Sequence, residues 1–205
     1  MRIDELNVVN EQETRILSIE QYFGEMRLPE EEKKKRIDMC EDFEVFLIYI
    51  IELGEEYELE VYTRMIQTGL IDIAKEHIDL TQAIINRINE DAQYIAETTK
   101  KYIDTPFYTS EDRATLLAEN ETQAISNISE YENAKEFGFT YKEWLAMPDE
   151  KVRETHALVD GEKVPIGTPF IVGDSLMMYP MDASLGASPQ EIINCRCSIR
   201  YTRNA

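Results

Sequence analysis

The last third of the chain contains the stretch Ile193-Asn-Cys195-Arg-Cys197-Ser-Ile-Arg-Tyr201. This run is short, rich in β-prone residues and free of proline, which predicts a terminal strand. Cys195 and Cys197 stand two residues apart, so they would face the same side of an extended chain. Two cysteines so placed are badly oriented for a mutual disulfide, and three cysteines in 205 residues do not make a disulfide scaffold.

A second informative segment lies upstream, at residues 149–161, and contains His156. We expect this segment to meet the Cys195–Cys197 stretch at one spot of a self-contained globule. Between them, four prolines punctuate short β-prone runs, and two glycine-aspartate pairs, 160–161 and 173–174, are turn candidates. The pattern predicts a compact α+β unit with short, irregular strands.

The sequence before residue 105 has a different pattern, with helical periodicity and a single proline, Pro29. We predict helices from Pro29 to about Gly54, at 58–67, at 70–102, and from Thr109 to about Phe137. In the basic run Lys33–Arg36, the last three residues each follow a glutamate by four positions, which favours a helix surface over a nucleic-acid patch. The fold class is therefore α+β, an acidic helical N-terminal region followed by a small C-terminal α+β domain.

The charge is strongly negative, −20 over the whole chain, and it is concentrated in the helical part. Residues 1–137 carry 14 basic against 32 acidic side chains, hence −18. Such a surface repels phosphates, so direct tight nucleic-acid binding is not expected. The longest apolar run, Val45–Ile51, is far shorter than the roughly 20 residues of a membrane span. We expect no membrane association and a reducing compartment.

Residues 111–201 resemble the C-terminal domain of the phage head morphogenesis family, the phage Mu protein F-like minor head proteins. The resemblance rests on the order and spacing of these elements: Ala118-Glu-Asn-Glu-Thr122, Gly138, Trp144, Asp149, Val152-Arg153-x-x-His156, Leu158-Val-Asp160-Gly161, Phe170, Tyr179-Pro180-Met181-Asp182 and Asn194-Cys195-Arg196-Cys197. Met181 departs from the family, which usually has glycine there, and this should alter the turn after Pro180. The other motif residues are interpreted as structural: Asp149, Arg153, Gly161, Pro180, Asp182, Asn194 and Arg196.

The resemblance implies a minor virion protein inside the head, made in the host cytoplasm, with the portal protein or the major capsid protein as partner. It implies head assembly, DNA packaging or ejection as the process. It divides the chain into a helical region, residues 1–104, and a Mu F-like domain, residues 105–205. Homo-oligomerisation is left open.

A metal site is one hypothesis for the C-terminal domain. In one branch of the family a Cys-x-x-Cys pair and a later histidine would complete a zinc site with Cys-x-Cys. By that comparison His156 takes the second position of the Cys-x-x-Cys pair, Arg153 takes the first, and Ile192 stands where the later histidine would be. The remaining candidate ligands are His156, Cys195 and Cys197, with Asp160 as a possible fourth. The alternative is no cofactor, with the same positions forming a hydrogen-bonded and packed cluster. In that cluster Arg153 or Arg196 would pair with Asp149, Asp160 or Asp182.

A catalytic site is the competing hypothesis. Arg153, His156, Glu191 and Cys195 are residue types found in hydrolases and nucleases, and a Cys/His pair can form an activated nucleophile. This would make the chain a toxin- or nuclease-related enzyme that uses the His156/Cys195 region. An adaptor of prophage origin is a third class. The resemblance favours a protein without catalytic residues, and we predict no enzymatic activity.

Overall fold

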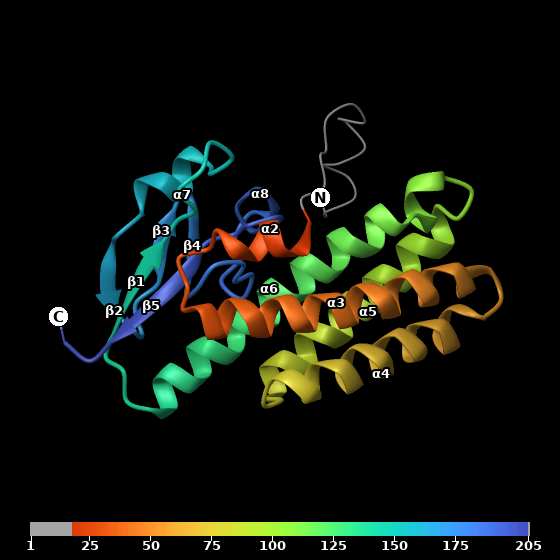
Figure 1. Ribbon diagram of the computed structural model, residues 1–205, viewed down its shortest axis with the longest axis horizontal. Helices are drawn as coiled ribbons and strands as arrows, with labels where there is room; N and C mark the ends of the chain where they lie inside the picture. Colours follow the sequence, from red (N-terminus) through yellow and green to blue (C-terminus); the bar gives the residue numbers. More distant parts are fainter. Residues whose placement is uncertain (1–17, 205) are drawn as a thin grey trace. The chain divides into compact units, whose positions relative to one another are not determined.

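The structure is a computed structural model that describes residues 18–204. The first 17 residues of the predicted helical region lie outside this part. The described chain begins with helices, in the order α2 (Ile19–Gly24), α3 (Glu30–Glu52), the 3-10 turn η1 (Leu53–Glu55), α4 (Leu59–His77), α5 (Gln82–Lys101), the 3-10 turn η2 (Pro106–Thr109) and α6 (Glu111–Glu136) (Figure 1). Short elements follow: β1 (Tyr141–Leu145), α7 (Glu154–Leu158), β2 (Lys163–Pro165), β3 (Phe170–Val172), β4 (Ser175–Met177), α8 (Pro189–Ile192) and β5 (Ser198–Thr202). The predicted α+β class is confirmed.

The chain forms two compact units whose boundaries fall inside α3 and α6. One unit consists of residues 34–129 and is helical. The other combines residues 130–204 with the described part of residues 1–33, and it contains all the strands of the described chain. The predicted division at residues 104/105 concerns the limits of the family domain and stays a prediction; the compact units are divided elsewhere.

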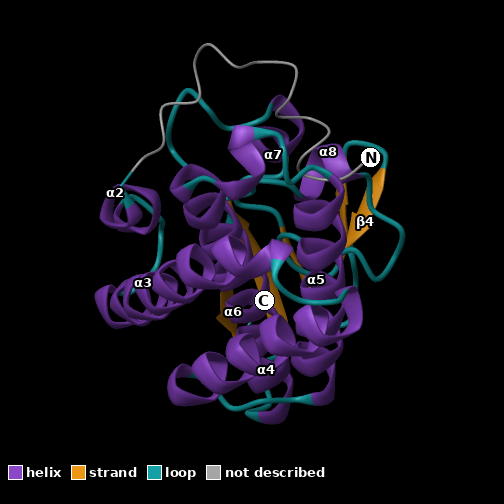
Figure 2. Cartoon of the chain, turned by 90° about the vertical axis from the view of Figure 1, so that its right-hand side faces the viewer, coloured by secondary structure: helices purple, strands orange, loops and turns teal. Residues whose placement is uncertain are grey.

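In the helical unit, α4 and α5, both labelled in Figure 2, pack against each other. Each contributes an apolar stripe. The buried residues recur every three or four positions, as a helix face requires: Tyr62, Ile66, Leu70 and Ala74 on α4, and Ile84, Ile88, Ala92 and Ile95 on α5. Gly69 lies inside α4, where a Cβ would meet the ring of Phe46 at 2.1 Å. A glycine is therefore required there for α3 to pack closely.

The break between α4 and α5 differs from the prediction of a helix over 70–102. Helix α4 continues through Gly69 to His77, and the chain becomes extended at Ile78 before Thr81 caps α5 through the Ile84 amide. A second difference is Arg36, which was predicted on the helix surface and is buried. Its guanidinium donates to Gln123 and Asn127 of α6. Helix α6 is buried over most of its length despite its polar sequence, and Gln123 and Asn127 are two of its buried polar side chains that have internal partners.

The strand-bearing unit has two small antiparallel sheets, β2-β1-β5 and the hairpin β3-β4. Strand β1 buries Lys142 and Trp144, which alternate with more exposed neighbours as a half-buried strand requires. The Trp144 ring lies edge-on to both His156 and Phe170, with centroids 5.6 and 5.2 Å away. The two predicted turns contain Gly161 and Gly173, both with positive φ. No helix in residues 18–204 has the length and apolar character of a membrane span.

Candidate metal centre

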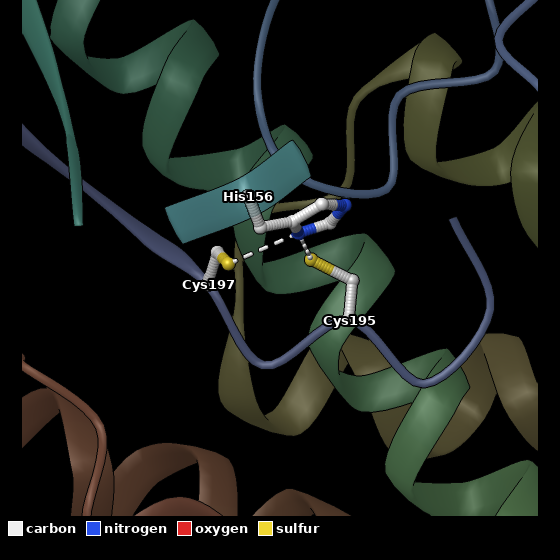
Figure 3. Close-up of side chains that lie close together, drawn as sticks. All are labelled: His156, Cys195 and Cys197. Atoms are coloured by element: carbon white, nitrogen blue, oxygen red, sulfur yellow. Dashed lines mark hydrogen bonds between the residues drawn. The ribbon is translucent and has the colours of Figure 1, made fainter. Parts of the chain in front are cut away.

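Three side chains that the sequence singled out lie together in the strand-bearing unit: His156 of α7, and Cys195 and Cys197 of the loop before β5 (Figure 3). Nδ1 of His156 is 3.5 Å from Sγ of Cys195 and 3.3 Å from Sγ of Cys197. The three possible ligand atoms lie within 4.8 Å of one another. The side chains are 1%, 1% and 2% exposed, in that order, so the site is closed to bulk solvent.

Local backbone geometry brings these residues together. Arg153 is the N-cap of α7, and its side chain donates a hydrogen bond to the carbonyl of Ile193. This bond joins the start of α7 to the segment just before the cysteines. Asn194 follows with a φ of 55°, a left-handed conformation that asparagine tolerates better than most residues. The predicted strand begins only at Ser198, so both cysteines belong to the loop that enters it.

The opposite edge of the imidazole is held by Glu191 of α8. Nε2 of His156 lies 2.9 Å from Oε2 of Glu191, and the hydroxyl of Thr155 donates to the same oxygen at 2.8 Å. Because an ionised carboxylate only accepts hydrogen bonds, it assigns a proton to Nε2. The other ring nitrogen, Nδ1, is the one that faces the two sulfurs. From the sequence, Glu191 was named only in the catalytic hypothesis, because its contact with His156 depends on where α8 folds.

The two thiols differ in acidity although they are neighbours. Burial raises the pKa of Cys195, but hydrogen bonds from Cys197 and His156 outweigh burial and bring this pKa well below its ordinary value. The pKa of Cys197 is raised well above its ordinary value, first by its hydrogen bond to Cys195 and then by burial. Burial lowers the pKa of His156, yet its interaction with Cys195 gives a net rise.

The comparison with known protein families identifies the chain. The model of the family described as phage Mu protein F like protein matches residues 76–200, more than half of the sequence. The chain belongs to this family. The predicted resemblance is thereby confirmed, and membership indicates a role in phage head morphogenesis. No curated protein and no solved structure shows significant similarity to the chain.

The Mu F-like motif residues surround the site and shape its loops. Arg196, between the cysteines, pairs with Asp149 and lies over the ring of Tyr22, its guanidinium carbon 5.9 Å from the ring centroid. Gly161 has a φ of 77° and donates its amide to the carbonyl of Trp144. Of the pairings considered from the sequence, Arg196 with Asp149 is the one that forms.

The second half of the motif orders the loop after β4. Pro180 is buried, and Asp182 accepts hydrogen bonds from the amides of Met178 and Ser184. Asp160 is not part of the metal-ligand group; its carboxylate accepts from the amide of Ala146 and from Arg27. The structure thus brings three of the four predicted ligands together, and Asp160 supports a neighbouring loop.

Proposed function

We propose that this Mu F-like chain is a minor head protein that acts inside the virion by binding the portal protein or the inner capsid surface. The proposal is carried by the family match over residues 76–200, which extends across parts of both compact units. Binding would place the chain where head assembly, DNA packaging or ejection takes place. Synthesis in the host cytoplasm remains part of the prediction.

The α3–α4 tip, residues 49–61, supports a protein-binding role for the helical unit. It exposes four apolar side chains, and Glu52, Glu55, Glu56, Glu58 and Glu60 are exposed among them without any lysine or arginine in the segment. The apolar residues are Tyr49, Tyr57, Leu59 and Val61. Aromatic anchors within a charged rim are typical of protein interfaces, and the acidic rim suits a basic partner surface.

The tip is also fixed in shape before any partner binds. The ammonium group of Lys100 donates to the carbonyls of Gly54 and Tyr57, at 2.8 and 2.6 Å. These bonds attach the turn between α3 and α4 to α5. A rigid surface loses less conformational entropy on binding than a mobile loop does. The tip therefore has the properties of a preorganised contact surface.

The test is a binding assay between the full-length chain and the portal protein, with capsid shells as the second target. Deletion of residues 1–104 would cut through the helical unit, so point variants are preferable. Tyr49→Ser should weaken binding about tenfold or more, the effect of losing an aromatic anchor. Phe137→Ser is the matched control, because Phe137 is 64% exposed against 61% for Tyr49 and lies in the other unit.

Binding through the acidic tip should also weaken as salt concentration rises. Retention by neither portal nor capsid would overturn the proposal. Equal binding of wild type and Tyr49→Ser, with loss in Phe137→Ser, would reject the tip as the contact surface.

We further propose that the protein is not an enzyme. One observation favours the enzyme alternative: Cys195 contacts His156, and His156 contacts Glu191. This arrangement matches a nucleophile, a base and an orienting carboxylate. Burial of the sulfur and the imidazole argues against it, because a substrate must reach the nucleophile. Slow alkylation of Cys195 at neutral pH is expected, and His156→Ala should not slow it further. Rapid alkylation that His156→Ala abolishes would support the enzyme.

A further inference from the structure

We propose that His156, Cys195 and Cys197 bind one zinc ion, which fastens α7 to the loop that enters β5. This inference goes beyond the role in the head, since it concerns what holds the strand-bearing unit together. The residues come from sequence positions about 40 apart, and one ion would cross-link them in a unit whose strands are at most five residues long. Small domains with short elements commonly use such a metal staple.

The two nitrogen–sulfur distances are those of a site close to tetrahedral, and the three candidate ligand atoms lie within 4.8 Å of one another. Zinc lies about 2.3 Å from thiolate sulfur and about 2.0–2.1 Å from imidazole nitrogen, which at tetrahedral angles separates nitrogen from sulfur by about 3.6 Å. The two observed separations, 3.5 and 3.3 Å, differ from this value by only a few tenths of an ångström. Figure 3 shows the imidazole nitrogen directed at both sulfurs from one side. Minor side-chain shifts would admit the ion.

The surroundings of His156 are those of a metal-bound histidine. Such a histidine usually donates its second N–H to a carboxylate, which orients the ring and strengthens its donor nitrogen. Glu191 provides this carboxylate at 2.9 Å, and Thr155 holds it in place from the side. Because Glu191 contacts the far nitrogen of the ring, it orients the ligand from outside the group of ligand atoms.

The charges around the site also balance when zinc is present. Two thiolates and the Glu191 carboxylate supply three negative charges, and zinc with the neighbouring Arg153 supplies three positive charges. The positive charge of Arg153 near the ion is therefore compensated. The guanidinium of Arg153 also donates a hydrogen bond to the carbonyl of Ile193. Two thiolates also select a soft or borderline cation such as zinc over magnesium or calcium.

The experiment uses the full-length chain without a histidine tag, purified under reducing conditions, supplied with zinc and freed of excess metal. One zinc per chain is expected for wild type. Cys195→Ser and Cys197→Ser should each lose it, whereas Cys40→Ala should keep it, because Cys40 is a buried thiol of the helical unit. Glu191→Gln should keep the stoichiometry and bind about 10- to 100-fold more weakly.

Cobalt provides a readout on folded wild type that needs no variant. Cobalt bound at this site should show thiolate charge-transfer absorption and quench the fluorescence of Trp144, the single tryptophan, whose ring is 5.6 Å from that of His156. Absence of stoichiometric zinc in reduced wild type would overturn the proposal. Zinc retained equally in both Cys195→Ser and Cys197→Ser would overturn it as well. Portal binding is measured separately, so its result does not affect this one.

Discussion

Replacing Met181 should reverse the usual order of stability between alanine and glycine variants. Met181 is 3% exposed and has a φ of 68°, so it combines a buried side chain with a left-handed backbone. Its position is the one where the resemblance to Mu F-like proteins leads us to expect glycine. The turn after Pro180 therefore has the backbone conformation that glycine favours, although a methionine occupies it.

The magnitudes follow from these two features. Met181→Ala loses the buried side chain, at about 2–5 kcal/mol, and keeps a left-handed L-residue. Met181→Gly loses the same side chain but relieves about 1–2 kcal/mol of backbone strain. The greater chain entropy of glycine in the unfolded state costs the glycine variant about 0.5–1 kcal/mol of stability. The glycine variant should therefore be the more stable by about 0.5–1 kcal/mol.

Met177 provides the matched control in the same unit. It is fully buried in β4, where φ is negative, so glycine has no strain to relieve. Met177→Gly should be less stable than Met177→Ala by about 0.5–1 kcal/mol. Urea unfolding followed by the fluorescence of Trp144 reports on this unit for all four variants. If glycine is less stable than alanine at both positions, the strain assigned to Met181 is refuted.

Two further predictions concern buried charges of the same unit. Burial lowers the pKa of Lys142 to about 8, although the nearby Asp182 acts in the opposite direction. In the unfolded chain the pKa of a lysine is about 10.4, so between pH 8 and about 10.4 the unfolded chain binds more protons than the folded one. The free energy of unfolding should therefore rise with pH over this range. Lys142→Met should remove this rise in urea titrations from pH 7.5 to 10; an unchanged slope would contradict the assignment. Asp149→Asn should destabilise by about 3–5 kcal/mol and more than Arg196→Met, because Arg196 is the more deeply buried partner and would be left without its counterion. Equal losses in thermal unfolding would count against that pairing.

The sequence predicted the fold class because it depends on local signals, such as the proline spacing and the Asp160-Gly161 turn, which are visible in a few residues. The meeting of the two C-terminal segments is a long-range contact, and it was expected together with the resemblance to the family. The helix boundary at residues 78–81 was not predicted, because Gly69 is a stronger breaker by propensity than Ile78. Gly69 packs against the ring of Phe46, and α4 continues through it despite the low helix propensity of glycine. A contact of this kind is visible only in three dimensions.

The burial and the partners of polar residues were the other feature that the sequence did not predict. Arg36 follows three lysines, and a basic run of that kind normally faces solvent. Its burial depends on Gln123 and Asn127, about 90 positions away on α6. Glu191 presents the same difficulty at the candidate site. Its residue type allows many roles, and only the fold of α8 against α7 brings its carboxylate to the imidazole.

The Asn-Cys-Arg-Cys motif illustrates how short-range order sets long-range contacts. Asn194 supplies the left-handed turn, after which residues two apart point to one side, so Cys195 and Cys197 both reach His156. Arg196, between the two cysteines, forms the ion pair with Asp149. The guanidinium of Arg196 is thus compensated by a carboxylate and does not add an unpaired cation near the proposed zinc. One four-residue sequence thereby supplies two metal ligands and the arginine that anchors the loop that carries them.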